Sequence, residues 1–355
     1  MGKGITLTVG LDLGDRKSQY CVLDHVTGEV MDEGKVAMVR PKMEEFLRTL
    51  GRSRLVLEAG TQSAWVTHLA EEVGHEVLVA QPSKFRAIAA SNRKSDKVDA
   101  RTLAMVGRVD PRLVFPVKHR GPQTQLDRAT LRSRDALVRA RTLLVNHCRS
   151  TSKLFGERAG SCSTSAFPKK FRDTMTAELR KLLEPMVRMI EVLSRQIRNY
   201  DREVARLCRE AYPETRRLSQ VPGVGALTAL AFVLTVEDPR RFRRSRDVGP
   251  YLGLVPRRDQ SGAVDRQLRI TKAGDKLMRR LLVGCAQYIL GPFGPDTDLR
   301  RWGLTYAGRG GKNAKKRAVV AVARKVAVLL HALWVSGGTY DPLRGHEPQD
   351  ARTAA

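Results

Sequence analysis

The first third of the chain alternates between strand-like and helix-like hydrophobic patterns. Residues 5–38 contain three strand-like runs separated by short polar turns, ITLTVGLDLG, SQYCVLD and EVMDEGKVAM. Helical and buried-strand patterns then alternate, as PKMEEFLRTLG, RLVLEAG, SAWVTHLAEEVG and HEVLVAQP, before a helix that contains SDKVDARTLAMVGRV. Three consecutive strands followed by alternating helices and strands predict an α/β domain with a mixed sheet over residues 1–115.

This order of elements resembles the ribonuclease-H-like, or RuvC-like, fold. In such a sheet the first and fourth strands are neighbours, with their relevant ends on the same side. The same fold also serves sugar kinases and actin-like ATPases, so the fold alone does not set the function.

Residues 116–214 change to a helical pattern. Apolar or tolerant residues recur there with alternating spacings of three and four, which is typical of a coiled-coil seam. The seam residues are Leu179, Leu182, Met186, Ile190, Leu193, Ile197, Tyr200, Val204, Leu207 and Ala211. An earlier stripe is the candidate antiparallel partner, and it consists of Leu126, Ala129, Leu137, Ala140, Leu144 and Cys148. Pro185 either starts the second helix or kinks it.

A basic face surrounds the earlier stripe of this helical region. Its members are Arg128, Arg132, Arg134, Arg139, Arg141 and Arg149. Two interpretations stay open: a helical hairpin that serves as a spacer with a solvated basic face, and an arm that binds nucleic acid.

Residues 215–338 predict a mainly helical and very basic third domain, and residues 339–355 a loose polar tail. The most apolar late segment, 318–335, is interrupted by Arg324, Lys325 and His331, which indicates a buried helix rather than a membrane span. The N-terminal residues lack the apolar core of a signal peptide. Five scattered cysteines form no CxxC pair, which fits a reducing cytoplasm and gives no sign of a zinc site or a disulfide framework.

The charge balance indicates the kind of partner. The chain carries 64 Lys and Arg against 37 Asp and Glu, a formal net charge of +27. Such an excess indicates a polyanionic partner, and nucleic acid is the commonest one. We therefore expect a cytoplasmic, nucleoid-associated protein that binds DNA.

Four carboxylates fall where the predicted sheet would gather them. Asp12 lies near the end of the first strand and Glu58 ends the fourth, while Asp96 and Asp99 project from one face of the closing helix. Individually, each is better explained as a turn, cap or surface residue. Jointly, they predict a cluster that a divalent metal would neutralise, and two metals about 4 Å apart could stabilise phosphoryl transfer.

The basic C-terminal part holds two further candidate sites. VPGVG, with Gly223 and Gly225, is either a phosphate-binding turn at a helix start or a plain interhelical turn. The residues Arg257, Arg258, Arg266, Arg269 and Lys272 flank a Gln260-Ser261-Gly262 turn. A serine amid cations could attack a phosphodiester, but from the residues alone Ser-Gly is simply a common turn pair.

The motifs together resemble those of the insertion-sequence-110 transposases, a family that includes Piv-type invertases. GLDLG, LVLEAG and KSDKVDARTLA resemble its DEDD motif, and VPGVGALTA, YLGLVPRRDQSG and ITKAGDKLMRRLLVGCA its C-terminal transposase domain. The resemblance covers nearly the whole chain. It departs from the family at AGTQSAW, which follows Glu58, and at Gly14, where many relatives carry Ser.

The resemblance implies a function and a set of roles. Asp12, Glu58, Asp96 and Asp99 would hold Mg²⁺ or Mn²⁺, and Ser261 would be the recombinase nucleophile, with Ser245 as the fallback. A structured noncoding RNA would choose the DNA partners, and a homo-oligomer, a dimer or tetramer, would assemble a composite site. The main alternative is a hydrolytic RuvC-type nuclease or junction resolvase, which needs the carboxylates but not Ser261. An ATPase or sugar kinase and a non-enzymatic nucleic-acid-binding protein stay open behind it.

Overall fold

The computed structural model of the chain describes residues 4–82, 84, 95–262 and 264–344. The chain divides into two compact units, Met1–Pro122 and Gln123–Ala355, and each is described by itself.

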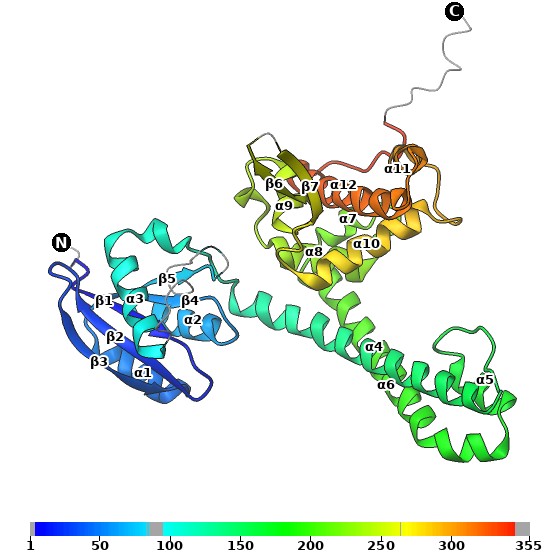
Figure 1. Cartoon of the computed structure of the whole chain (residues 1–355), viewed down its shortest axis with the longest axis horizontal. Helices are drawn as coiled ribbons and strands as arrows, with labels where there is room; N and C mark the ends of the chain where they lie inside the picture. The colour runs from blue at the N-terminus through cyan, green and yellow to red at the C-terminus, as the bar shows by residue number, and fades with distance from the viewer. Residues whose placement is uncertain (1–3, 83, 85–94, 263, 345–355) are drawn as a thin grey trace, which may run out of the picture. The chain divides into compact units, whose positions relative to one another are not determined.

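The first unit is an α/β domain built on one mixed five-stranded sheet (Figure 1). Its strands are β1 (Leu7–Asp12), β2 (Lys17–Asp24), β3 (Val30–Ala37), β4 (Ser53–Glu58) and β5 (Glu76–Ala80), and its helices are α1 (Arg40–Thr49), α2 (Ser63–Val73), α3 (Asp96–Val109) and the 3-10 helix η1 (Pro111–Val114). The strand order is β3-β2-β1-β4-β5. Strands β1 to β3 pair antiparallel, whereas β4 pairs parallel with both β1 and β5. The predicted mixed sheet is confirmed, and the first and fourth strands are neighbours.

The two faces of this sheet are covered by different helices. Val9 and Leu11 of β1 and Leu55 and Leu57 of β4 pack in one core cluster with the buried residues of α1 and α2. Since successive side chains of a strand point to opposite faces, the intervening residues face the other side. There Val56 of β4 packs with α3, so the sheet has α1 and α2 on one face and α3 on the other.

Helix α3 approaches the sheet very closely at Gly10. A Cβ atom on Gly10 would lie 1.9 Å from the carbonyl oxygen of Ala100 and 2.6 Å from the backbone nitrogen of Ala104. One turn further along, a Cβ on Gly107 would lie 2.4 Å from a methyl group of Val56. Glycine at these crossing points lets the helix backbone lie directly on β1 and β4.

The second unit is mainly helical, with one small β-ribbon. Its helices are α4 (Pro122–Leu154), α5 (Phe167–Thr174), α6 (Ala177–Glu210), α7 (Thr215–Leu218), α8 (Ala226–Val236), α9 (Val248–Tyr251), α10 (Lys276–Leu290), α11 (Asp298–Gly308) and α12 (Ala314–Ser336), with 3-10 helices η2 (Pro239–Arg241) and η3 (Ser245–Asp247). The ribbon pairs β6 (Pro256–Ser261) with β7 (Val264–Ile270). One large apolar core joins α8, α10, α12 and the C-terminal end of α6.

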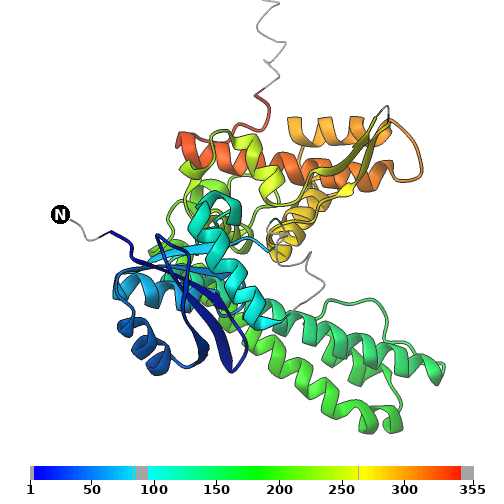
Figure 2. The same cartoon turned by 60° about the vertical axis from the view of Figure 1, so that its left-hand side comes forward.

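Helices α4 and α6 run side by side (Figures 1 and 2), but the apolar seam of α6 differs from the predicted one. The predicted positions Leu182 and Met186 are exposed by 61% and 38%, while their neighbours Leu183 and Val187 are buried. The seam is shifted because α5 packs its two phenylalanines, Phe167 and Phe171, onto this end of α6. From Ile190 onward, the predicted seam agrees better with the structure. Ile190, Ile197, Val204 and Leu207 are buried, Leu193 and Tyr200 are half-buried, and Ala211 is exposed.

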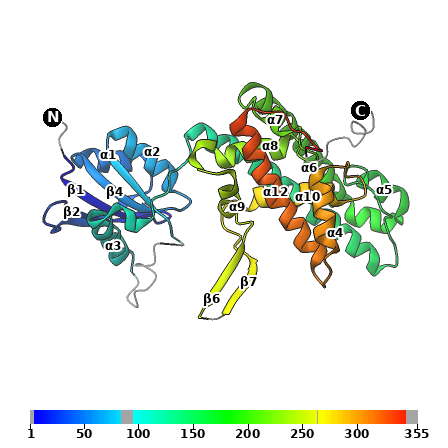
Figure 3. The same ribbon diagram turned by 90° about the horizontal axis from the view of Figure 1, so that it is seen from above.

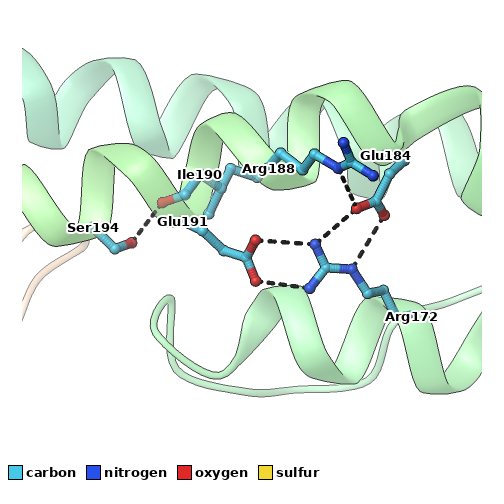
Figure 4. A network of polar contacts seen from close by, with 6 residues as sticks. All are labelled: Arg172, Glu184, Arg188, Ile190, Glu191 and Ser194. Atoms are coloured by element: carbon cyan, nitrogen blue, oxygen red, sulfur yellow. Dashed lines mark hydrogen bonds and ion pairs between the residues drawn. The ribbon is translucent and has the colours of Figure 1, made fainter.

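An ion-pair network holds α5 against α6 (Figure 4). Arg172 of α5 lies 2.9 Å from Glu184 and 2.7 Å from Glu191, and Arg188 adds a third contact, 3.0 Å from Glu184. The hydrogen bonds from Arg172 lower the pKa values of both glutamates. Pro185 lies inside α6 and does not start it. Since proline lacks an N–H, this network braces the turn in which one backbone hydrogen bond is missing.

Helix α12 forms the centre of the second unit. It is long and apolar enough to cross a membrane by length and composition. However, Ala318, Val322, Val326 and Leu330 are completely buried in the core of the unit, as predicted for a buried helix.

The predicted loose tail is wrong for its first residues. The Tyr340 N–H donates to Gln220 Oε1 at 2.8 Å, and the Pro342 carbonyl accepts from Asp298 N at 2.9 Å. Tyr340 also packs against the core of the unit, and this aromatic anchor is what holds the segment. Residues 345–355 of the predicted tail lie outside the described residues.

Candidate functional site

The ends of β1 and β4 bring two of the predicted carboxylates together. Leu11 lies opposite Leu57 in the parallel register, so the next residues, Asp12 and Glu58, stand on neighbouring strands about 4.8 Å apart. Leu11 and Leu57 face α1 and α2. By strand alternation, both half-buried carboxylates therefore face the side of the sheet that α3 covers.

Helix α3 adds the third carboxylate to the same end of the sheet. Asp99 is 6% exposed and directly precedes Ala100, whose carbonyl lies over Gly10, two residues before Asp12. Asp96 begins the helix and is exposed. Both acids lie in the first turn, where the helix dipole stabilises negative charge.

Two contacts fix the start of α3. The side chain of Ser95 accepts from Val98 N and caps the helix. Lys97 lies 2.7 Å from Glu33 of β3, and this hydrogen bond lowers the pKa of Glu33. The neighbouring Cys21 is buried beside Glu33. Its burial, and to a smaller extent the negative charge of Glu33, raise the pKa of its thiol to about 11. Cys21 is therefore a neutral packing residue at neutral pH.

Gln62 is a site residue that sequence analysis missed. It lies in AGTQSAW, the segment that departs from the usual family pattern after Glu58. Its Nε2 donates to the carbonyl oxygens of Gly14 and Asp15, at 3.1 and 3.0 Å. Gln62 thereby ties the loop after β4 to the loop after β1, and so connects the two strand ends that carry Asp12 and Glu58.

The donor set of this site fits a hard divalent cation, since carboxylate oxygens are the preferred ligands of Mg²⁺ and Mn²⁺. The backbone places Asp12, Glu58 and Asp99 at one end of the sheet, and Asp96 one turn away from Asp99. In the part of the chain that the structure describes, however, no three His, Cys, Asp or Glu side chains are gathered closely enough to hold an ion. When bound, a divalent metal would supply positive charge to oppose the charge that develops on a reacting phosphate.

Ser261 lies at the tip of the β6–β7 ribbon, which projects from the helices of the second unit (Figure 3). Every residue of β6 is exposed. Gly262 has a φ of +54° and makes the tight turn after the serine. The sequence predicts a turn at this place, and in the structure the turn joins the two strands of a ribbon.

The pairing register sorts the basic residues of the ribbon by face. Asp259 lies opposite Arg266, so the two share one face of the ribbon. Arg257 and Ser261 are two residues before and two residues after Asp259 on β6, and they therefore lie on the same face. On the other face, Arg258 lies 2.7 Å from Asp265, and this hydrogen bond lowers the pKa of Asp265.

The two remaining predicted cations differ in backbone position. Arg269 is exposed and lies where the β6–β7 register shifts, and Lys272 follows β7 in the left-handed region, with a φ of +57°. Arg257 and Arg266 are thus the predicted cations on the face of Ser261.

Ser245, the fallback nucleophile, is engaged by a buried histidine. Its Oγ lies 2.9 Å from Nδ1 of His331, which is 2% exposed, and Nε2 of that ring lies 2.8 Å from the carbonyl oxygen of Pro239. Because a carbonyl only accepts, the neutral ring carries its proton on Nε2, and Nδ1 accepts from the serine. The pair anchors η2 and η3 to α12, whereas Ser261 is exposed.

The VPGVG segment forms the turn between α7 and α8. Gly223 has a φ of +79°, its carbonyl accepts from Cys285 Sγ at 2.8 Å, and a Cβ on it would meet Tyr288 at 3.0 Å. Gly225 precedes α8 and has open space around it. The turn is thus required by packing against α10, and the geometry favours the plain interhelical turn at Gly223.

An acidic end of a mixed sheet, together with a basic helical unit, fits an enzyme that acts on DNA, and the comparisons show that its class is transposase. Two family models match the chain. One, DEDD_Tnp_IS110, is described as "Transposase" and matches residues 9–154; the other is described as "Transposase IS116/IS110/IS902 family" and matches residues 215–297.

Relatives match over almost the whole chain. A "Probable family 20 transposase" of Pseudomonas aeruginosa is 30% identical, over 94% of this chain and 98% of its own. The "Transposase for insertion sequence element IS1111A" of Coxiella burnetii is 28% identical, over 94% and 90%. A "Pilin gene-inverting protein" of Moraxella lacunata is 24% identical, over 96% and 98%.

The chain belongs to the IS110 family of insertion-element transposases, which catalyse DNA strand cleavage and transfer. The predicted family is therefore confirmed. Membership of a DEDD family also points to a divalent metal as the cofactor.

Proposed function

We propose that this transposase cuts and rejoins DNA through Ser261, with Asp12, Glu58, Asp96 and Asp99 holding Mg²⁺ or Mn²⁺. The proposed metal site rests on one observation: Asp12 and Glu58 are adjacent on parallel strands, on the face of the sheet that α3 covers. The serine half is supported by the exposure of Ser261 on the face of Arg257 and Arg266.

The chemical step is a transesterification. The Ser261 oxygen attacks a backbone phosphorus; a P–O(Ser) bond forms as one P–O bond of the DNA breaks, and the leaving hydroxyl end takes up a proton. Arg257 and Arg266 stabilise the charge on the phosphate oxygens. A carboxylate of the acidic site accepts the serine proton. Attack by a hydroxyl end of the second DNA reverses the step and joins the strands, so the energy of the broken bond is retained.

The partners in this proposal are two DNA segments, the element junction and its target. A structured noncoding RNA bound by the protein selects both. A homo-oligomer, a dimer or tetramer, supplies acidic sites and serines to the two DNAs. The net charge of +27 supports a protein that holds RNA and DNA together.

A covalent adduct tests the serine step. The protein, co-expressed with RNA from its flanking noncoding segments, is incubated with Mg²⁺ and junction DNA and then denatured. We expect a protein–DNA adduct with the wild type and with Ser245→Ala, and none with Ser261→Ala or Asp99→Asn. If DNA is cut without an adduct and Ser261→Ala cuts equally well, the protein is a hydrolytic nuclease and the proposal is wrong.

A mixing experiment tests the composite site. Asp99→Asn and Ser261→Ala are each inactive in this scheme, but together they supply one intact acidic site and one intact serine. If different protomers contribute the two, the mixture regains adduct formation, and the adduct is on the Asp99→Asn chain. No recovery in mixed oligomers would show that one protomer supplies both groups.

A further inference from the structure

The hairpin of α11 and α12 carries a basic surface that has no role in the scheme above. It comprises Arg309, Lys312, Lys315, Lys316 and Arg317, all exposed, and is called the α11–α12 basic turn below. From residue 299 to residue 340 the chain has nine Lys and Arg and not one Asp or Glu. The one acidic residue of α11, Asp298, begins the helix at the end far from the turn, eleven residues before Arg309.

By contrast, several other cations of the second unit are paired with carboxylates. On α4, Arg128 lies 2.7 Å from Asp275, and Arg134 lies 2.6 Å from Asp201. On α6, Arg206 contacts Glu203 and Glu210. Within the described residues, none of the five cations of the α11–α12 basic turn makes an ion pair. Their full charge is thus presented to solvent.

Aromatic rings order two cations of this hairpin, Lys325 and Arg309. Lys325 Nζ lies 3.9 Å from the centre of the Trp302 ring, which stacks on Tyr306 with centroids 5.5 Å apart, and the Arg309 guanidinium lies 5.0 Å from the Tyr306 ring. A ring positions a cation without cancelling its charge. The ladder therefore holds Arg309 at the turn while leaving it able to bind an anion.

This arrangement is unfavourable for the protein alone. Lys315, Lys316 and Arg317 occupy the first turn of α12, where the helix dipole disfavours positive charge and neighbouring cations repel each other. Lys315 to Arg317 span about 3 Å along the helix axis at 1.5 Å per residue, and Lys312 lies in the turn just before the helix. Duplex DNA carries one negative charge per about 1.7 Å of axis, so several of its phosphates would face such a group of cations.

We propose that the α11–α12 basic turn is a nucleic-acid-binding surface that contacts the phosphodiester backbone, separate from the Ser261 ribbon. Its ligand is the phosphate backbone of DNA or RNA, without dependence on base sequence. The inference does not need Ser261 or the carboxylates to act as proposed, since it concerns binding alone.

The test compares the salt dependence of binding in the full-length protein, with EDTA present so that no strand chemistry occurs. The variant is Lys312→Ala/Lys315→Ala/Lys316→Ala. The matched control removes three exposed lysines of α4, α5 and α6, as Lys153→Ala/Lys169→Ala/Lys181→Ala. Both proteins lose the same net charge. The probes are a 20-base-pair DNA duplex and a 20-nucleotide RNA of arbitrary sequence.

Each phosphate contact contributes about 0.9 to the slope of log K against log salt on duplex DNA, and about 0.7 on a single strand. Between 50 and 200 mM salt, the wild type should therefore lose about 40-fold more affinity than the variant on DNA, or about 18-fold more on RNA. Loss on one probe alone identifies that nucleic acid as the ligand. A charge-preserving variant, with the same three lysines changed to Arg, should keep the wild-type slope.

Equal slopes for the wild type and the triple-Ala variant on both probes would overturn the proposal, as would an equal loss in the control. Misfolding is tested by thermal unfolding. Because the three lysines are exposed and lie near a helix start, the triple-Ala variant should unfold no earlier than the wild type. Failure of the Ser261 adduct would leave this result unchanged, so the two proposals fail separately.

Discussion

Gly10→Ala is the change most sharply defined by the structure. The added Cβ would lie 1.9 Å from the Ala100 carbonyl oxygen, and Cβ atoms essentially never approach another atom closer than 3.0 Å. The obstructing atom belongs to a helix backbone and cannot rotate away. Helix α3 must therefore move from β1 by about 1.1 Å even to reach that limit.

The displacement has two consequences of different size. Overpacking of this kind typically costs about 1–3 kcal/mol of unfolding free energy. Asp99 directly precedes Ala100 and moves with the helix, whereas Asp12 stays with the strand. Metal–ligand distances tolerate only about 0.2 Å, and a misplacement of about 1 Å can lower a rate about 100-fold. Activity should thus fall much further than stability.

The assay is recombination of a reporter that carries the element junction and its target, measured beside urea unfolding of the purified protein. Gly51→Ala is the matched control, because its Cβ would have only Thr6 nearby, at 3.9 Å. We expect about a 100-fold loss for Gly10→Ala and no loss for the control. If the two variants recombine equally well, the close packing of α3 does not assemble the acidic site.

Three further changes test other contacts. Gln62→Ala should lower recombination while costing about 1–2 kcal/mol of unfolding free energy, since two hydrogen bonds between the loops are lost. Asp275→Asn should cost about 3–5 kcal/mol at pH 7, because it removes the buried carboxylate that forms an ion pair with the half-buried Arg128. Burial raises the Asp275 pKa, but the Met278 N–H and Arg128 outweigh it and the pKa is lowered. The deficit seen by urea unfolding should therefore be complete above about pH 4 and shrink as the pH falls through the folded pKa. Ser245→Ala should lower unfolding free energy by about 1 kcal/mol, through loss of the His331 hydrogen bond, while adduct formation on Ser261 persists.

The sheet could be predicted because its signals are local and independent. Apolar runs gave the strands, their order gave the mixed topology, and Asp12 and Glu58 end strands that the topology makes neighbours. The β6–β7 ribbon could not be predicted in the same way. Its first strand, PRRDQS, is polar on both faces and fully exposed, so it has no apolar alternation to reveal it.

Contacts between distant segments were also beyond sequence reasoning. Ser245 and His331 are 86 positions apart. In the sequence, His331 is only a polar residue within an apolar run, and nothing there connects it with Ser245. The shift of the α6 seam has a similar origin. Both Leu182 and Leu183 fit a helical period, and the choice between them depends on how α5 packs. Tertiary packing selected among patterns that the sequence allowed equally.

The distribution of carboxylates bears on the two interpretations left open for the helical region. A net charge of +27 does not say which arginines are available, because pairing removes them one by one. On the predicted basic face of α4, Arg128 and Arg132 share Asp275, and Arg134 and Arg139 each have an aspartate within 4.0 Å. Of the other two, Arg141 donates a hydrogen bond to Ser194 and Arg149 lies over the Phe167 ring, and neither contact cancels the charge. Cations used within the fold cannot release counterions from a nucleic acid without first breaking those pairs. The geometry therefore favours the spacer interpretation for α4, and nucleic-acid binding is better sought where the neighbouring sequence has no acidic residues, at the α11–α12 basic turn.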